Sequence, residues 1–274
     1  HHHRRGGSDA RGAPHLSGTR LIDGHAHLEA EPGYVDALLR ACDRLGIEQV
    51  CVSGLGAAFA MADNASVSEA VRQHPDRLIG FRYLRLGRHP LQDVDLAVEE
   101  GFRGLKFTIP LRPYDHESYL PVYERAQAYG LPCLFHTGIV TTKQHLAGVS
   151  SAHMRPLHLD TVAHQFPRLR LICAHLGMPW YEEAAAIARI LPNVYVDLSG
   201  APSGWRAQKD PSFFRSLLYW PDAWSKVIWG SDVHHGDLEA ALRRDQALAD
   251  ELGLSAEQRS AYFGGNLISL LPAL

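Results

Sequence analysis

The segment LIDGHAH, residues 21–27, decides the fold. It begins with apolar residues, as a buried strand does, and ends with two histidines on either side of Ala26. Side chains alternate between the two faces of a strand, so His25 and His27 project from the same face. Two imidazoles at that spacing can share one metal ion. The segment therefore predicts a strand that ends in two candidate metal ligands, although a His-x-His pair also arises by chance.

Seven further apolar segments have the length of strands, and longer segments with helical spacing lie between them. Several are almost continuously apolar, as expected of parallel strands buried on both faces. Helix candidates such as 34–46, 91–101, 119–130 and 180–190 carry apolar residues three and four positions apart. The alternation predicts parallel strands with helical crossovers. The eight candidate strands are LIDGHAH (21–27), QVCVSG (49–54), LIGFRYL (78–84), RGLKFT (103–108), PCLFHT (132–137), LRLICAH (169–175), NVYVDLS (193–199) and KVIWGSD (226–232).

Periodicity alone fits two architectures, an open doubly wound sheet and a closed (β/α)8 barrel. The positions of the polar residues favour the barrel. His136 and His175 each stand where an apolar strand meets a loop, and Asp232 ends the eighth candidate strand. In a barrel, the carboxyl ends of all the strands converge on the catalytic face. A core histidine or a helix-capping aspartate would explain any one of these residues alone, but their common position favours a shared site.

We predict one domain over residues 21–274, an α/β chain folded as a (β/α)8 TIM barrel, because no Ser/Gly linker or charge run interrupts the pattern. The tail, residues 238–271, is expected to form two closing helices. Residues 1–20 begin with three histidines and lack apolar periodicity. We interpret them as an expression-tag remnant and a flexible leader.

The composition argues against several classes of partner. A formal net charge of −3 gives no sign of the clustered basic field that nucleic acids or acidic membranes require, so we expect a small-molecule substrate. The four cysteines are scattered without a C-x-x-C pair, which is typical of reduced, buried thiols in a cytoplasmic protein. No apolar run reaches the roughly 18 residues of a membrane span. A homodimer is possible.

The motifs DGHAH, GLKF, GLPCLFHTG, ICAHLG, VYVDLSG and WGSD occur in this order. Together they resemble the amidohydrolase superfamily, and most of all its amidohydrolase-2 branch, which includes the aminocarboxymuconate-semialdehyde decarboxylase-like enzymes. The resemblance extends from about residue 20 to GNLISLL near the end. It implies that His25, His27, His136 and Asp232 bind the metal. It also implies that Asp232 is a proton acceptor and that His175 acts beside the metal.

Three imidazoles and one carboxylate with an open position suit one divalent ion, Zn²⁺ first and Mn²⁺ second. We expect a metal-dependent hydrolase in which metal-activated water attacks a lactone, amide or ester carbonyl, while His175 or Asp232 moves protons. The alternative is a metal-dependent, non-oxidative decarboxylase of an aromatic or unsaturated carboxylic acid. A third reading, a barrel with a structural metal or none, fits less well with ligands at the catalytic mouth.

Three basic residues are candidates for substrate binding. Lys106 ends the fourth candidate strand and could anchor a substrate carboxylate. The alternatives are a carbamylated Lys106 that bridges a second metal, as in some members of the superfamily, or a surface lysine. Arg82 and Arg85, near the end of the third strand, could grip an anionic group or lie on the surface. Thr108 stands where many relatives carry a histidine, which weakens transfer of the details around this strand.

The loop 139–157 is the longest stretch on the catalytic side without a periodic pattern. Long functional loops occur at this place in barrels, so we expect a lid or a substrate-specific loop.

Overall fold

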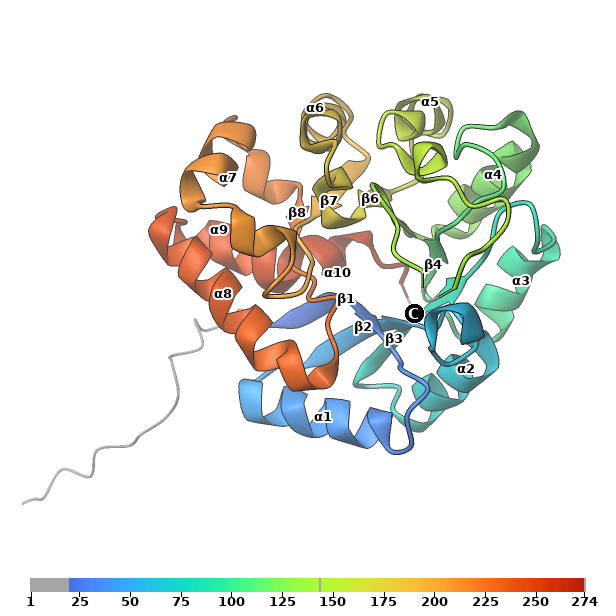
Figure 1. Cartoon of the computed structure of the whole chain (residues 1–274), viewed down its shortest axis with the longest axis horizontal. Coiled ribbons are helices and arrows are strands. Elements are labelled where there is room, and N and C mark those ends of the chain that lie inside the picture. The colour runs from blue at the N-terminus through green and yellow to red at the C-terminus, as the bar shows by residue number, and fades with distance from the viewer. Residues whose placement is uncertain (1–19, 143, 274) are drawn as a thin grey trace, which may run out of the picture.

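Eight parallel strands follow one another around a barrel in chain order, which confirms the predicted TIM barrel. The computed structural model describes residues 20–142 and 144–273, so the predicted leader lies outside it except for Arg20. Figure 1 shows the helices arranged around the strands. The strands are β1 (Ile22–His27), β2 (Gln49–Ser53), β3 (Leu78–Tyr83), β4 (Gly104–Phe107), β5 (Cys133–Phe135), β6 (Leu171–Cys173), β7 (Val194–Asp197) and β8 (Val227–Ile228).

The tail differs from the two helices expected. The first, α8, is continuous, but the second is divided into α9 and α10 by a wide turn at Ala261–Gly265. A Cβ on Gly264 would lie 2.3 Å from the carbonyl oxygen of Arg20, so this turn approaches the start of the domain closely. The helices are α1 (Tyr34–Leu45), α2 (Asn64–Gln73), α3 (Gln92–Glu99), α4 (Leu120–Tyr129), α5 (His158–Gln165), α6 (Tyr181–Ile190), α7 (Pro211–Leu217), α8 (Leu238–Glu251), α9 (Ala256–Ser260) and α10 (Asn266–Leu270).

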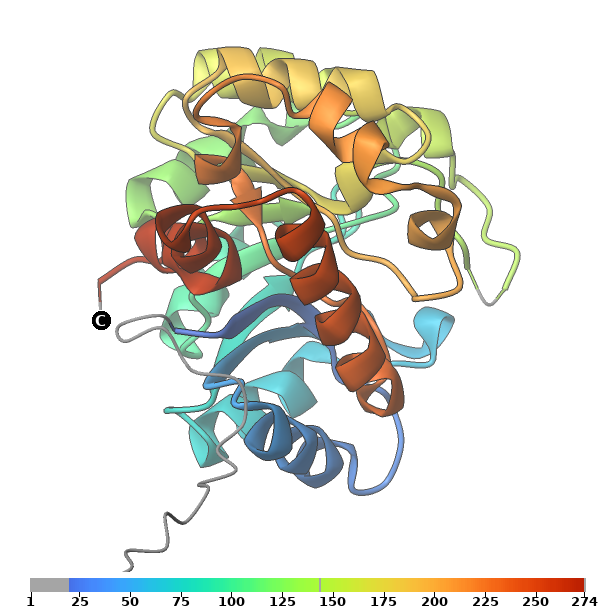
Figure 2. The ribbon, with the colours of Figure 1, turned by 90° about the vertical axis from the view of Figure 1, so that its left-hand side faces the viewer.

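The barrel is completed where β8 returns to β1. The amide of Gly24 donates to the carbonyl oxygen of Trp229 at 2.9 Å, and the amide of Asp232 donates to that of His25 at 2.7 Å. A Cβ on Gly230 would lie 2.6 Å from the His25 Cβ, so glycine permits this close approach. Outside the strands, α1 and α8 lie side by side (Figures 1 and 2).

An irregularity in β1 turns both histidines into the barrel. Ile22 belongs to the cluster inside the barrel, whereas Ala26, an even number of residues away, packs in the cluster between strands and helices. The pairing of β1 with β2 shifts register between Asp23 and Ala26, as at a β-bulge. The Asp23 carboxylate accepts the His25 amide at 3.1 Å across this irregularity. His25 and His27 therefore face the interior.

The interior of the barrel has an apolar lower half, at the amino ends of the strands. Leu267 and Leu270 of α10 close this end. The strands contribute Ile22, Cys51, Ile79, Phe81, Leu134, Ile172 and Ile228. All four cysteines are buried and unpaired. Among the described residues, no helix is both long and apolar enough to cross a bilayer.

Candidate metal centre and active site

Three predicted ligands converge at the upper, carboxyl end of the barrel. The Nε2 atoms of His27 and His25 lie 3.1 and 3.6 Å from Oδ1 of Asp232. Potential ligand atoms of these three residues all lie within 4.8 Å of one another. Asp232 has a left-handed backbone, with φ of 49°, a conformation that is strained for an aspartate and often found at functional sites.

The other ring nitrogen of each histidine is held by a buried partner. His25 Nδ1 lies 2.8 Å from Oδ2 of Asp197, and His27 Nδ1 lies 2.9 Å from Oγ of Ser53. Burial, followed by the charge of Lys106, lowers the pKa of His25 to about 4, so this imidazole is neutral near pH 7. Nδ1 of His25 then carries the proton, and Nε2 directs its lone pair toward Asp232 and Lys106. Metal-binding histidines are typically oriented in this way, so the donor set fits a divalent ion.

His175 lies on the opposite side of Asp232. Its Nε2 is 3.3 Å from Oδ2 of Asp232, and its Nδ1 is 3.1 Å from the carbonyl oxygen of Ser199 and 2.9 Å from the Ser199 hydroxyl. Because a carbonyl oxygen only accepts hydrogen bonds, Nδ1 carries the proton and Nε2 can accept one. Burial alone would raise the pKa of Asp232, but His25, His27 and His175 together hold it well below the usual value, so Asp232 is ionised.

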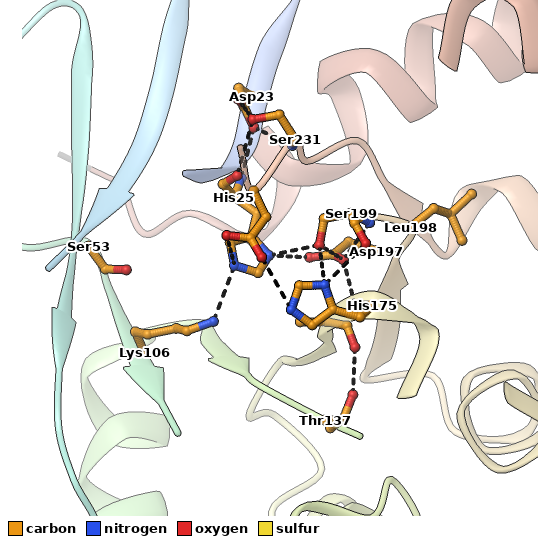
Figure 3. A network of polar contacts seen from close by, with 12 residues as sticks. Asp23, His25, Ser53, Lys106, Thr137, His175, Asp197, Leu198, Ser199 and Ser231 are labelled. Atoms are coloured by element: carbon orange, nitrogen blue, oxygen red, sulfur yellow. Dashed lines mark hydrogen bonds and ion pairs between the residues drawn. The ribbon is translucent and has the colours of Figure 1, made fainter. Parts of the chain in front are cut away.

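Asp197 and Ser199, at the end of β7, orient both His25 and His175 (Figure 3). Oδ1 of Asp197 accepts the His175 amide at 2.8 Å and the Ser199 hydroxyl at 2.6 Å. Sequence reasoning assigned neither residue a role, although both lie in the motif VYVDLSG. Both could have been found by their position at the end of an apolar strand, because that criterion identified His136, His175 and Asp232.

A buried ion pair holds the Ser199 segment against α8. Arg206 donates to the carbonyl oxygen of Leu198 at 2.7 Å and pairs with Asp245 of α8, also at 2.7 Å. Arg244 donates to the carbonyl oxygen of Gly200 at 2.7 Å. These arginines therefore fix the backbone on both sides of Ser199.

Lys106 enters the site, whereas the two predicted arginines do not. Lys106 is 1% exposed, and its ammonium lies 3.3 Å from Nε2 of His25 (Figure 3). Burial lowers its pKa to about 8. Arg82 follows the inward-facing Phe81 and points outward, where it pairs with Glu100 at 2.8 Å. Arg85 donates to the carbonyl oxygen of Ile109 at 2.8 Å and does not line the pocket.

A cavity of about 320 Å³ lies above these residues. His27, Lys106, His136, His175 and Asp232 line it, together with apolar side chains from the surrounding loops. His136 thus reaches the predicted site, but its Nε2 lies 3.2 Å from the carbonyl oxygen of Ile139. Burial, followed by the charges of His175 and Lys106, lowers the pKa of His136 well below the usual value.

A second group of possible ligands, Glu31, His234 and His235, lies on the rim. Nδ1 of His234 accepts the Gly236 amide at 3.0 Å, so Nε2 carries the proton that is donated to Glu31 at 2.9 Å. That proton blocks the nitrogen that a metal would need. The hydrogen bond between His234 and Glu31 therefore joins the loop after β8 to the loop after β1.

Several known proteins are similar to this chain. Protein fluG of Emericella nidulans is 28% identical over 104 residues, which make up 38% of this chain and only 11% of that protein. An uncharacterised TIM-barrel protein of Bordetella bronchiseptica has a TM-score of 0.71 at 17% identity, with 92% of this chain and 98% of that chain covered.

Two further structures have names that state an activity. A probable 2-pyrone-4,6-dicarboxylic acid hydrolase of Acinetobacter baumannii, with citric acid bound, has a TM-score of 0.64 at 14% identity, covering 92% of this chain and 98% of that chain. A 5-carboxyvanillate decarboxylase of Novosphingobium aromaticivorans, with bound manganese, has a TM-score of 0.63 at 13% identity, covering 92% and 96%. At these identities, the likeness establishes the fold alone.

The family assignment rests on a match along almost the whole domain. The amidohydrolase model Amidohydro_2 matches residues 22–272, from the first strand to the end of the last helix. The match includes His25 and His27 at its start and Asp232 near its end. This chain belongs to the amidohydrolase-2 family.

Proposed function

We propose that this protein is a metal-dependent hydrolase that cleaves a lactone, amide or ester of a small molecule. The observation that carries the proposal is the convergence of His25, His27 and Asp232 beneath a cavity that His27 and Asp232 line, with His175 3.3 Å from Asp232. A divalent ion held by these ligands would polarise the substrate carbonyl and acidify water. Zinc suits the donor set, and manganese is the second choice.

The residues of this chain can move the protons that hydrolysis requires. Asp232 is ionised, so its carboxylate can take a proton from the attacking water. His175 Nε2 faces Oδ2 of Asp232, so it can receive that proton and pass it to the leaving oxygen or nitrogen. Asp197 and Ser199 keep His175 in the required tautomer through its Nδ1.

Decarboxylation is the second candidate, and Lys106 is the observation that favours it. Its buried ammonium faces the cavity beside the metal ligands and could hold a substrate carboxylate. The carbon–carbon bond would break with release of carbon dioxide, and the carbon would take up a proton from solvent water, relayed through His175 or Asp232. The manganese-containing decarboxylase with the same fold gives this alternative weight.

One assay can separate the two reactions. The protein is loaded with one equivalent of Zn²⁺ or Mn²⁺ and incubated in ¹⁸O-water with aryl esters and lactones, or with aromatic carboxylic acids. Hydrolysis places ¹⁸O in the acid product, whereas decarboxylation releases carbon dioxide and no labelled acid. His27→Ala serves as the control because it removes one ligand. Neither product above the level of this control, across the panel and with both metals, would contradict the proposal.

A further inference from the structure

The walls of the cavity are largely apolar and come mainly from three loops, with Met178 added from the loop after β6. Phe59 and Met61 follow β2, Ile139 and Val140 follow β5, and Trp205 follows β7. Figure 2 shows these loops projecting from the same end of the barrel. The loop 139–157 thus reaches the cavity through its first residues.

The charges of the cavity are confined to its floor. Among the described residues that line it, every ionisable side chain belongs to the group of four site residues and Lys106 named above. The walls add only the hydroxyl groups of Thr108 and Thr141, and the Thr108 hydroxyl already faces the Met154 sulfur at 3.8 Å. An anionic group placed against these walls would lose water without gaining a cationic partner, which is unfavourable.

Two wall residues offer apolar surface suited to a ligand. Ile139 is 45% exposed at the cavity, so a ligand could remove its side chain from water. Trp205 is fixed by a hydrogen bond from its Nε1 to the carbonyl oxygen of Ser199 at 2.9 Å. A rigid indole beside a mobile substrate lowers the entropy lost on binding.

We propose that the substrate has one polar, reacting end and an uncharged, apolar body. The polar end faces Lys106 and the metal ligands, and the body lies against Ile139 and Trp205. A second carboxylate or a phosphate on the body is excluded. This inference rests on the proposed metal-dependent function, because the floor must hold the metal for the reacting end to bind there.

Three hydroxamic acids test the inference through binding alone. Acetohydroxamate, benzohydroxamate and 4-carboxybenzohydroxamate share the same metal-binding group and differ in the body. Their affinities for the zinc-loaded protein are measured by calorimetry. We expect acetohydroxamate to bind at least about 10-fold more weakly than benzohydroxamate, because it buries less apolar surface. The 4-carboxy probe should also be at least about 10-fold weaker, because its carboxylate has no partner.

Two variants at one position identify the cause. Ile139→Arg places a cation on the wall and should tighten binding of the 4-carboxy probe about 10-fold relative to Ile139→Gln, the uncharged control. His25→Ala/His27→Ala keeps the N-terminal histidines, so its residual signal measures what they contribute.

The outcomes separate this inference from the proposed function. Equal affinity for benzohydroxamate and its 4-carboxy form, with binding lost in the double-histidine variant, would overturn the substrate class and leave the metal site standing. If benzohydroxamate does not bind the wild type, or binds the double-histidine variant equally well, both the substrate class and the metal site are overturned. We expect the wild type to bind the 4-carboxy probe more weakly than benzohydroxamate. Ile139→Arg should reduce this difference, and Ile139→Gln should not.

Discussion

The two halves of the barrel interior differ in kind, although the same strands build both. The lower half is closed by Leu267 and Leu270 against apolar strand residues. The upper half holds His25 and Asp197, which are buried, and Asp232, which is partly exposed and has a strained backbone. A non-glycine residue held in a left-handed backbone conformation costs about 1–3 kcal/mol of folding free energy. We infer from this comparison that the apolar packing below offsets the cost of the strained, polar site above.

A lysine also lies near each end of the barrel, buried in the case of Lys106 and partly buried in the case of Lys226, and the two have different tasks. Burial lowers the pKa of both Lys106 and Lys226 to about 8. Lys226, just before β8, donates to the carbonyl oxygens of Ala188 and Leu191 at 2.7 and 2.8 Å. Lys106 instead faces His25 across the cavity floor. Lys226 therefore donates hydrogen bonds to carbonyl groups at the carboxyl end of α6, whereas Lys106 points into the site.

The largest expected effect is on the upper half alone. In His25→Ala/His27→Ala, with the N-terminal histidines removed from variant and wild type alike, we expect metal content to fall from about one equivalent to near zero and activity to fall at least about 1,000-fold, because two of the ligands are gone. The apo forms of the variant and the wild type should unfold at similar temperatures. Elemental analysis and thermal denaturation check this. A variant that kept its metal would show that the ion binds elsewhere. Two equivalents in the wild type would instead favour a bridging, carbamylated Lys106.

The next largest effect concerns the lower half. Leu267→Ala should destabilise the protein by about 2–5 kcal/mol, because Leu267 is 1% exposed and its truncation leaves a cavity. Metal content should stay at one equivalent. Ile190→Ala, on a side chain that is 60% exposed, is the control and should change stability little. Loss of metal from folded Leu267→Ala would show that the halves are not separable.

The sequence was sufficient for the architecture and for much of the site, because strand ends were marked by polar residues. Strand alternation could not show which face of β3 carries Arg82. The strand LIGFRY is apolar on both faces, so its sequence does not distinguish inward from outward positions. The irregularity in β1 has no sequence signal that we can identify. The contact of His136 with Ile139 depends on loop geometry, which periodicity does not describe.

A smaller effect is expected from the residues that orient the upper half. Ser199→Ala removes the hydroxyl that lies 2.9 Å from Nδ1 of His175, but leaves the Ser199 carbonyl oxygen as a partner. We expect activity to fall about 10-fold, with metal content retained, because residues behind a catalytic group typically contribute at this level. The pH profile of kcat should shift as well, since the environment of His175 changes. A drop in stability with an unchanged profile would indicate a structural role only.

The smallest effect distinguishes the lower lysine. The folded-state pKa of Lys226, about 8, lies below the ordinary value of 10.5, because burial disfavours the charged amine. Between these values the unfolded chain binds more protons, so this lysine makes the folded state more stable as pH rises from about 8 to 10.5. In Lys226→Met this contribution disappears, and the Tm difference, wild type minus variant, should increase over that range by no more than about 2 °C, since the amine is partly exposed to solvent. The other titrating groups are common to both proteins and cancel in the difference. A constant difference would mean that the ammonium of Lys226 is fully solvated in the folded state.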